Sequence, residues 1–363
     1  MAYIKKQKNG KWFARVSWYD ENKVKHQKSK ATFKTKVEAT RWSNSFLNDV
    51  YSGNSIIQEV TFYDYFVDWF KTYKEPRLAK VTITRYKIIA KLIKEEFGNK
   101  KLTKVTRRDY QKFINKFGKN HAPDTVKKTN SIIKSCIKSA IIDNKLKNDF
   151  TQNIELVVNK DKEIKVEYLS LNEIKLLISF LEDNLDSRYT ANYMILTAIY
   201  TGMRLGEICA LTWNDININH RTITIDKSWD YIYGSGFKPT KTESSNRTIR
   251  VNQGLINILL DLKNNDELMI FKNIQGTIPT SNGVNKQLRY ALNKCNIHKS
   301  NFHFHSLRHS HVALLLYYGI DLYSISKRLG HSDMTTTSKK YAYLIDELKA
   351  KSDNHIEEIL QNM

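Results

Sequence analysis

The spacing of apolar residues predicts a small sheet and one helix at the start of the chain. Asn9-Gly10 is a strong β-hairpin signal, and an aromatic run with the composition of a strand follows it. A polar turn and a third strand come next. Thr35 and Glu38 then have the spacing of a capping box that opens a helix. We therefore expect residues 1–55 to form a three-stranded β-sheet with a helix.

From residue 59 to residue 155, apolar residues recur at the three- and four-residue spacing of helices. Four helices are predicted from their ends, with Thr61 and Thr106 as N-caps, Gly98 as a stop and Pro123 as a start. The result is a four-helix module with lysine-rich outer faces. The charged stretch within residues 156–168 is the best linker candidate in the chain.

Residues 169–363 are predicted to form a larger, mostly helical domain that opens with a capping box at Ser170. Two helices lead to a glycine turn, and strands at residues 222–225 and 247–251 precede a second run of helices. The last predicted helix runs from about residue 345 to residue 360. It packs either on its own domain or on a neighbouring protomer, and the sequence leaves both open.

Positive charge is concentrated in the first half of the 363-residue chain, whose formal net charge is +22. Residues 1–55 hold 12 Lys/Arg against 4 Asp/Glu, residues 56–155 hold 22 against 11, and residues 156–363 hold 25 against 22. A lysine-rich surface is often only a solvated face, but that interpretation does not explain the asymmetry. The distribution favours a polyanionic partner, and nucleic acid is the commonest one.

Cysteine usage and hydropathy indicate the compartment. Cys136, Cys209 and Cys295 are far apart and form no CxxC pair, so neither a disulfide framework nor a zinc ribbon is indicated. The N-terminal residues contain no apolar signal-peptide core, and no stretch of about 18 apolar residues occurs. We therefore expect a protein of a reducing cytoplasm that is neither secreted nor membrane-spanning.

A spaced series of polar residues in the second half predicts a phosphate-binding site with a nucleophile. The series is Arg204, Lys241, His305, Arg308, His331 and Tyr341. Paired guanidiniums can stabilise charge on nonbridging phosphate oxygens in place of a metal ion, and Arg204 and Arg308 lie in otherwise apolar runs. We therefore expect neither a metal nor a cofactor.

Tyr341 is the predicted nucleophile. A phenol with a pKa of about 10 suits both attack on a phosphodiester and later departure, so that the energy of the broken bond is kept in a covalent link. Tyr343 is a minor alternative. Lys241 is predicted to protonate the leaving 5′-oxygen, and Lys238 is a close rival.

Histidines complete the series. His305 is predicted to accept the Tyr341 proton or to hold the phenol, and His331 to donate to a phosphate oxygen. His309 and His311 are expected to be structural.

Several motifs follow one another in a fixed order. They are Thr201–Glu207 (TGMRLGE), Lys241-Thr242 ahead of Ser245-Asn246-Arg247, His305–His309 (HSLRH), Leu329-Gly330-His331, and Tyr341. In this order they resemble the tyrosine recombinases of phage and conjugative-transposon integrases, and the resemblance covers nearly the whole chain. It implies a mainly α catalytic domain with a small antiparallel sheet, a four-helix SAM-like domain, and an N-terminal domain of three strands and a helix.

The resemblance also implies the activity. Such an enzyme integrates and excises a mobile element, such as a prophage or a conjugative transposon, through a 3′-phosphotyrosyl intermediate at Tyr341. Residues 1–55 would bind arm-type DNA sites, residues 59–155 would bind core-type sites, and residues 169–363 would catalyse. Four protomers would assemble on two double-stranded attachment sites and pass through a Holliday junction. The resemblance leaves open whether an excisionase and a DNA-bending host factor take part.

Two other functions compete with this hypothesis. Phe302-His303-Phe304-His305 alternates like a strand that presents two histidines to Mg²⁺ or Mn²⁺, as in rolling-circle nickases and relaxases. Helical spacing from His305 onward opposes that interpretation. A non-catalytic site-specific DNA-binding protein is the second alternative, although every chemical position is filled. A type IB topoisomerase would share the chemistry but needs no separate basic N-terminal module.

Overall fold

The computed structural model describes residues 2–19, 23–51, 60–163, 166–230, 236–332, 338, 341 and 360–361. It divides into two compact units, Met1–Ile164 and Lys165–Met363. Most elements are helices, and the sheets have three, three and two strands. The predicted fold class is confirmed in its parts: a sheet with a helix, a four-helix bundle, and a helical unit with a small antiparallel sheet. The predicted C-terminal helix and Tyr343 lie outside the described residues, apart from Leu360.

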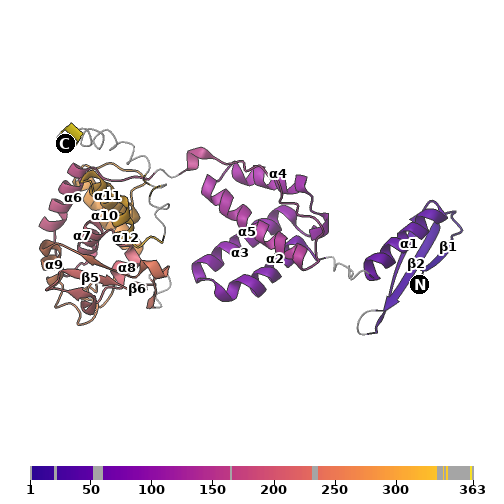
Figure 1. Ribbon diagram of the computed structural model, residues 1–363, viewed down its shortest axis with the longest axis horizontal. Helices are drawn as coiled ribbons and strands as arrows, with labels where there is room; N and C mark the ends of the chain where they lie inside the picture. Colours follow the sequence, from indigo (N-terminus) through magenta and orange to yellow (C-terminus); the bar gives the residue numbers. More distant parts are fainter. Residues whose placement is uncertain are drawn as a thin grey trace. The chain divides into compact units, whose positions relative to one another are not determined.

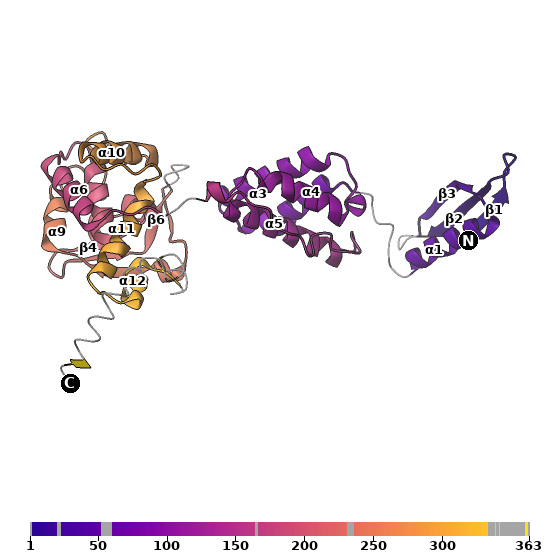
Figure 2. The same ribbon diagram turned by 90° about the horizontal axis from the view of Figure 1, so that it is seen from above.

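The N-terminal sheet has the order β1-β2-β3 and is antiparallel throughout. Its strands are β1 (Ala2–Lys6), β2 (Trp12–Tyr19) and β3 (Lys25–Phe33), and α1 (Lys36–Tyr51) follows. Gly10 has φ +78° in the first hairpin, a backbone conformation that favours glycine there. Helix α1 packs along β2, where alternate residues such as Ala14 and Val16 are fully buried (Figure 2). The predicted polar turn at residues 20–22 lies outside the described residues.

Four helices form the next bundle (Figure 1). They are α2 (Phe62–Trp69), α3 (Lys80–Phe97), α4 (Arg107–Gly118) and α5 (Pro123–Ile142). Their predicted ends are confirmed: Thr61 and Thr106 accept hydrogen bonds from backbone amides of the first turn, and α3 stops at Gly98. An aromatic core that includes Phe62, Trp69 and Tyr110 holds the bundle together.

A strap of irregular chain, residues 154–159, lies along α4. Gln111 brackets Glu155, donating to its carbonyl at 2.8 Å and accepting from its amide at 3.0 Å. The Asn159 amide donates to the His121 carbonyl at 3.0 Å. A Cβ on Gly118 would overlap the Val157 carbonyl, so only glycine allows this close approach. The predicted linker, residues 156–168, therefore starts within a segment that is hydrogen-bonded to the helical bundle.

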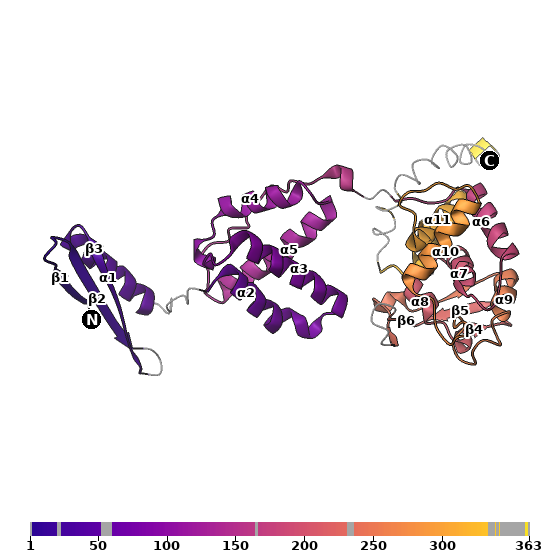
Figure 3. The ribbon, with the colours of Figure 1, turned by 180° about the vertical axis from the view of Figure 1, so that it is seen from behind.

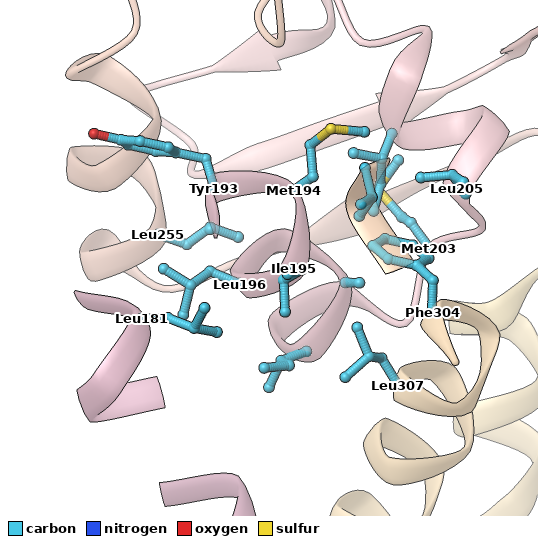
Figure 4. Packing of buried hydrophobic residues seen from close by; sticks show 14 of the residues in the cluster. Leu181, Tyr193, Met194, Ile195, Leu196, Met203, Leu205, Leu255, Phe304 and Leu307 are labelled. Carbon is cyan, nitrogen blue, oxygen red and sulfur yellow. The ribbon is translucent and has the colours of Figure 1, made fainter. Parts of the chain in front are cut away.

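The second unit is built around α7 (Ala191–Thr201), a helix that is apolar and buried on every side. Leu196 and Met194 point into different parts of the surrounding core, which includes Leu181, Leu255 and Leu307 (Figure 4). Helices α6 (Leu171–Asp183), α8 (Leu205–Cys209), α9 (Gln253–Leu260), α10 (Ser281–Lys294) and α11 (Phe304–Tyr317) contact α7 (Figure 3), and α12 (Leu322–Leu329) packs on α11.

The sheet of this unit has the order β4-β5-β8 and is antiparallel. Its strands are β4 (Ile216–Asn217), β5 (Thr222–Ile225) and β8 (Arg247–Arg250), so the two strands predicted here are confirmed. A further hairpin of β6 (Lys227–Trp229) and β7 (Phe237–Pro239) was not predicted. Among the described residues, no helix is long and apolar enough to cross a membrane.

His311 ties α11 to α7 and α12. Its Nδ1 lies 2.8 Å from the Ile199 carbonyl, and its Nε2 accepts from Arg328 Nε at 3.1 Å. The side chain therefore uses both ring nitrogens as a neutral imidazole. Burial and the nearby Arg328 charge lower the pKa of His311 to about 3.

Replacing Gly118 with alanine should dislodge the strap. Because the new Cβ would overlap the Val157 carbonyl, Gly118→Ala should destabilise the first unit by roughly 1–3 kcal/mol, the usual cost of overpacking. Hydrogen exchange at the Glu155 and Asn159 amides should become faster. In Gly254→Ala, the matched control, the added Cβ meets only Asn252 Oδ1 at 3.9 Å, so stability should be unchanged or slightly higher. Unchanged exchange in Gly118→Ala would contradict the tight contact.

The neutral His311 should make the second unit sensitive to acid. Below pH 6.5 the unfolded chain binds a proton at this position, but the folded chain does not until the pH is near 3, so stability falls as acid is added. At pH 5 the loss should be about 2 kcal/mol relative to pH 7.5. Calorimetry should show that the difference in the free energy of unfolding between pH 7.5 and pH 5 is smaller by about 2 kcal/mol in His311→Asn than in the wild type. It should remain in a variant of the exposed His220, His220→Asn.

Candidate active site

Arg204 lies in the turn between α7 and α8. Gly202 caps α7 in the left-handed conformation, with φ +66°, and Arg204 is the extended N-cap residue of α8. The Glu207 carboxylate closes this turn by accepting from the Arg204 amide at 3.0 Å and from Nη1 at 2.6 Å. The glycine turn predicted from the sequence is thus present, and it leaves the Arg204 side chain 29% exposed.

Arg308, on the first turns of α11, is only 3% exposed and joins three motifs. Its Nη1 donates to the Gly202 carbonyl at 2.8 Å, and its Nη2 donates to the Leu329 carbonyl at 2.7 Å and to His331 Nε2 at 3.0 Å. Burial, followed by the charge of Arg204, lowers the pKa of Arg308 to about 9. Two guanidiniums that repel each other at close range are an arrangement suited to binding an anion.

Glu207 is the acidic partner of this cluster. It is 3% exposed and is paired with Arg204 at 2.6 Å and with Arg247 at 2.9 Å. Burial opposes ionisation of the carboxyl, but the two arginines outweigh it and lower its pKa. The sequence pattern assigned no role to Glu207 or Arg247, although both lie inside the quoted motifs. Their pairing spans 40 residues, which no local pattern reveals.

Tyr341 is buried, at 1% exposure, against the cluster of Val312, Ile325 and Leu329. Its hydroxyl lies 2.6 Å from His309 Nδ1. His305, predicted to act on the phenol, is exposed and meets His309 edge-to-face with ring centroids 5.2 Å apart. His309, expected to be structural, therefore contacts the tyrosine hydroxyl. Its position next to Arg308 and one helical turn after His305 was the available signal.

Lys241 is exposed in the turn between β7 and β8. Thr240 Oγ1 donates to the Thr242 carbonyl and to Asn246 Oδ1 at 2.9 and 2.7 Å, which fixes the loop around the lysine. Its rival Lys238 lies on β7, with Nζ 3.7 Å from Asp230 Oδ1. The structure thus brings Arg308 and His331 into contact, with Arg204 near enough for its charge to lower the pKa of Arg308, and it places Lys241 on a neighbouring loop.

The alternating Phe-His-Phe-His segment is not a strand. His303 is the N-cap residue of α11, which begins at Phe304, and its Nδ1 lies 2.9 Å from the Asn301 carbonyl. His303 and His305 therefore belong to a cap and a first helical turn. Within the part of the chain that the structure describes, no group of three or more His, Cys, Asp or Glu has a metal-binding arrangement.

Comparison with known proteins identifies the family. Residues 167–347 match the "Phage integrase family", and residues 61–118 match the "Phage integrase, N-terminal SAM-like domain". The integrase of Staphylococcus phage L54a is 28% identical over 338 residues, covering 85% of this chain and 95% of that protein. The ICEBs1 integrase of Bacillus subtilis (strain 168) is 26% identical and covers 75% of this chain and 76% of its own length.

Solved structures share the fold. The Tn1549 transposon integrase in complex with a circular intermediate DNA has a TM-score of 0.69 at 19% identity, covering 81% of this chain and 99% of that chain. A lambda integrase dimer bound to a COC′ core site has a TM-score of 0.58 at 16% identity and covers 93% of each chain. With family matches on both helical parts and the predicted arginines gathered in one cluster, the chain belongs to the phage integrase family and is a site-specific tyrosine recombinase.

Proposed function

We propose that Tyr341 attacks a DNA phosphodiester that is held by Arg204, Arg308 and His331. The observation that carries the proposal is the buried Arg308 guanidinium, which is repelled by Arg204 and bonded to His331. The phenol oxygen forms a bond to phosphorus, the bond from phosphorus to the 5′-oxygen breaks, and a 3′-phosphotyrosyl link remains. The two guanidiniums stabilise the charge that develops on the nonbridging oxygens.

Two proton transfers accompany this step in the proposed mechanism. The phenol proton passes to the histidine pair of His309 and His305, because His309 Nδ1 is within hydrogen-bond reach of the hydroxyl. Lys241 gives a proton to the departing 5′-oxygen. The exposed Lys241 and its ordered loop support this role, and the pairing of Lys238 with Asp230 makes Lys238 the weaker candidate. Religation reverses the sequence with a new 5′-hydroxyl.

The substrate that we propose is a pair of double-stranded attachment sites of a mobile element. Solved structures of lambda integrase contain DNA: one is a dimer bound to a COC′ core site, and another is a tetramer bound to a Holliday junction. We assign core-type DNA to residues 59–155 and arm-type DNA to residues 1–55, since the positive charge is concentrated there. A homotetramer carries out integration and excision, and the DNA substrate places it in the bacterial cytoplasm. An excisionase and a DNA-bending host protein are the accessory partners to test.

A nicked suicide substrate tests the nucleophile. The wild-type protein should form a covalent adduct with DNA that survives denaturation and EDTA, because arginines replace a metal ion in the proposed chemistry. Tyr341→Phe should abolish the adduct but retain DNA binding. Tyr317→Phe, a change at an exposed tyrosine, should leave the adduct at the wild-type level. An adduct in Tyr341→Phe, or its loss in EDTA alone, would overturn the assignment.

The contact of His309 with Tyr341 can be tested by two substitutions. His309→Phe keeps a ring but removes both nitrogens, so single-turnover cleavage should slow by about 10²-fold, the lower range for lost acid–base help. His309→Asn carries a polar group close to the Nδ1 position and should recover part of the rate. The exposed His220→Phe serves as the control. Wild-type cleavage in His309→Phe would show that the hydrogen bond has no catalytic role.

A further inference from the structure

Arg247 contacts three parts of the candidate active site, although the mechanism assigns it no role. The side chain leaves the start of β8 and is 6% exposed. Its three nitrogens donate in three directions: first, Nη2 to Glu207 Oε2 at 2.9 Å; second, Nε to the Arg328 carbonyl at 2.7 Å; and third, Nη1 to the Ser245 carbonyl at 2.8 Å. A planar guanidinium can hold three acceptors at fixed angles, which a lysine ammonium on a flexible stem cannot do.

The first direction fixes the Arg204 charge. Glu207 shares its carboxylate between Arg204, at Oε1, and Arg247, at Oε2. Because Arg247 holds one oxygen, the carboxylate plane is set and the other oxygen is aimed at Arg204. Without Arg247 the buried carboxylate would lose half of its charge pairing, which is costly in a buried position.

The second direction fixes the turn that carries His331. Arg247 Nε holds the carbonyl of Arg328 at the end of α12, and the next residues are Leu329 and Gly330. Gly330 has φ +68°, and a Cβ there would lie 3.1 Å from Arg247 Nη1 and 3.0 Å from Ser245 Cα. The turn therefore rests directly on the arginine and on the lysine loop.

The third direction fixes that loop. Arg247 Nη1 holds the Ser245 carbonyl, and Ser245 in turn bonds back to Thr242, amide to carbonyl at 2.9 Å and hydroxyl to hydroxyl at 2.9 Å. Ser245 is fully buried. Thr242 is the residue next to Lys241. Ser245 therefore links the backbone at Lys241 to Arg247, through its two hydrogen bonds with Thr242 and its carbonyl bond with Arg247.

We propose that Arg247 is a positioning residue for strand cleavage, which sets the Lys241 loop and the Arg204 side chain relative to the His331 turn with one guanidinium. This inference rests on the proposed mechanism, in which a group on the Lys241 loop protonates the 5′-oxygen. The hydrogen bonds of Arg247 go to two backbone carbonyls and to Glu207, so it acts on the reaction through other residues. Its loss should therefore weaken protonation of the leaving group in addition to phosphate stabilisation.

A change of leaving atom separates these effects. In a substrate with sulfur in place of the bridging 5′-oxygen, the departing thiolate is a weak base and needs no proton. Loss of the general acid therefore no longer slows cleavage of this substrate. Single-turnover cleavage of the oxygen substrate by Arg247→Gln should be slower by about 10²-fold, within the range for lost general acid help. Cleavage of the sulfur substrate should be slowed far less. Arg247→Lys should resemble Arg247→Gln, because charge without the fork does not hold three acceptors.

The control is Arg250→Gln, which removes an exposed arginine from the same strand and should stay within about twofold of wild type on both substrates. Gly330→Ala gives an independent variant that keeps Arg247 but presses on it and on Ser245, and it should give the same preference for sulfur. Equal slowing of Arg247→Gln on the two substrates, or no slowing, overturns the proposal.

Lys241→Ala distinguishes failure of this inference from failure of the proposed mechanism. Rescue of Lys241→Ala by sulfur supports Lys241 as the acid, and absence of rescue removes that role. The positioning role of Arg247 is tested by its own variants alone, through the ratio of their cleavage rates on the oxygen and sulfur substrates. If Arg247→Gln is rescued and Lys241→Ala is not, Arg247 still positions the acid, and the acid is another group on the loop.

Discussion

The second unit depends on one buried carboxylate among guanidiniums. Glu207 is the acid between Arg204 and Arg247, and Arg308 is buried beside Arg204. A buried charge is tolerated only when it is paired and hydrogen-bonded. Arg204 lies in a turn, Arg247 on a strand and Arg308 on a helix. Because their charges must be compensated together, folding also brings these distant parts of the chain to one place. Folding and assembly of the site are in this sense the same event.

The arginines also complete the ends of helices. Gly202 caps α7, and Arg328 and Leu329 are the last residues of α12, where backbone carbonyls have no partner within the helix. Arg308 binds two of these carbonyls, and Arg247 binds the third. The guanidiniums of Arg308 and Arg247 are therefore held by fixed backbone acceptors in the absence of DNA. Such preorganised donors stabilise a transition state without the cost of reorienting during the reaction.

The sequence predicts what is local and misses what is not. N-caps at Thr61 and Thr106 were predictable because cap and first turn are neighbours in sequence. The β6–β7 hairpin was missed because strands of three residues contain too few positions to display a period of two. Motif order singled out the residues that are proposed to bind phosphate, but it could not show that His309 would contact Tyr341, 32 residues away. That pair forms only because Tyr341 packs against α11 and α12 in the folded chain.

The charge count of the cluster explains why it suits this chemistry. Three guanidiniums, from Arg204, Arg247 and Arg308, and one carboxylate, from Glu207, leave a net charge of +2. A phosphodiester brings one negative charge, and the pentacoordinate state that follows attack carries a second. Burial, and after it repulsion from Arg204, lowers the pKa of Arg308, and in the proposed mechanism this repulsion is relieved in part when DNA binds and further as the transition state forms. Because this relief increases along the reaction, it lowers the barrier rather than merely tightening binding.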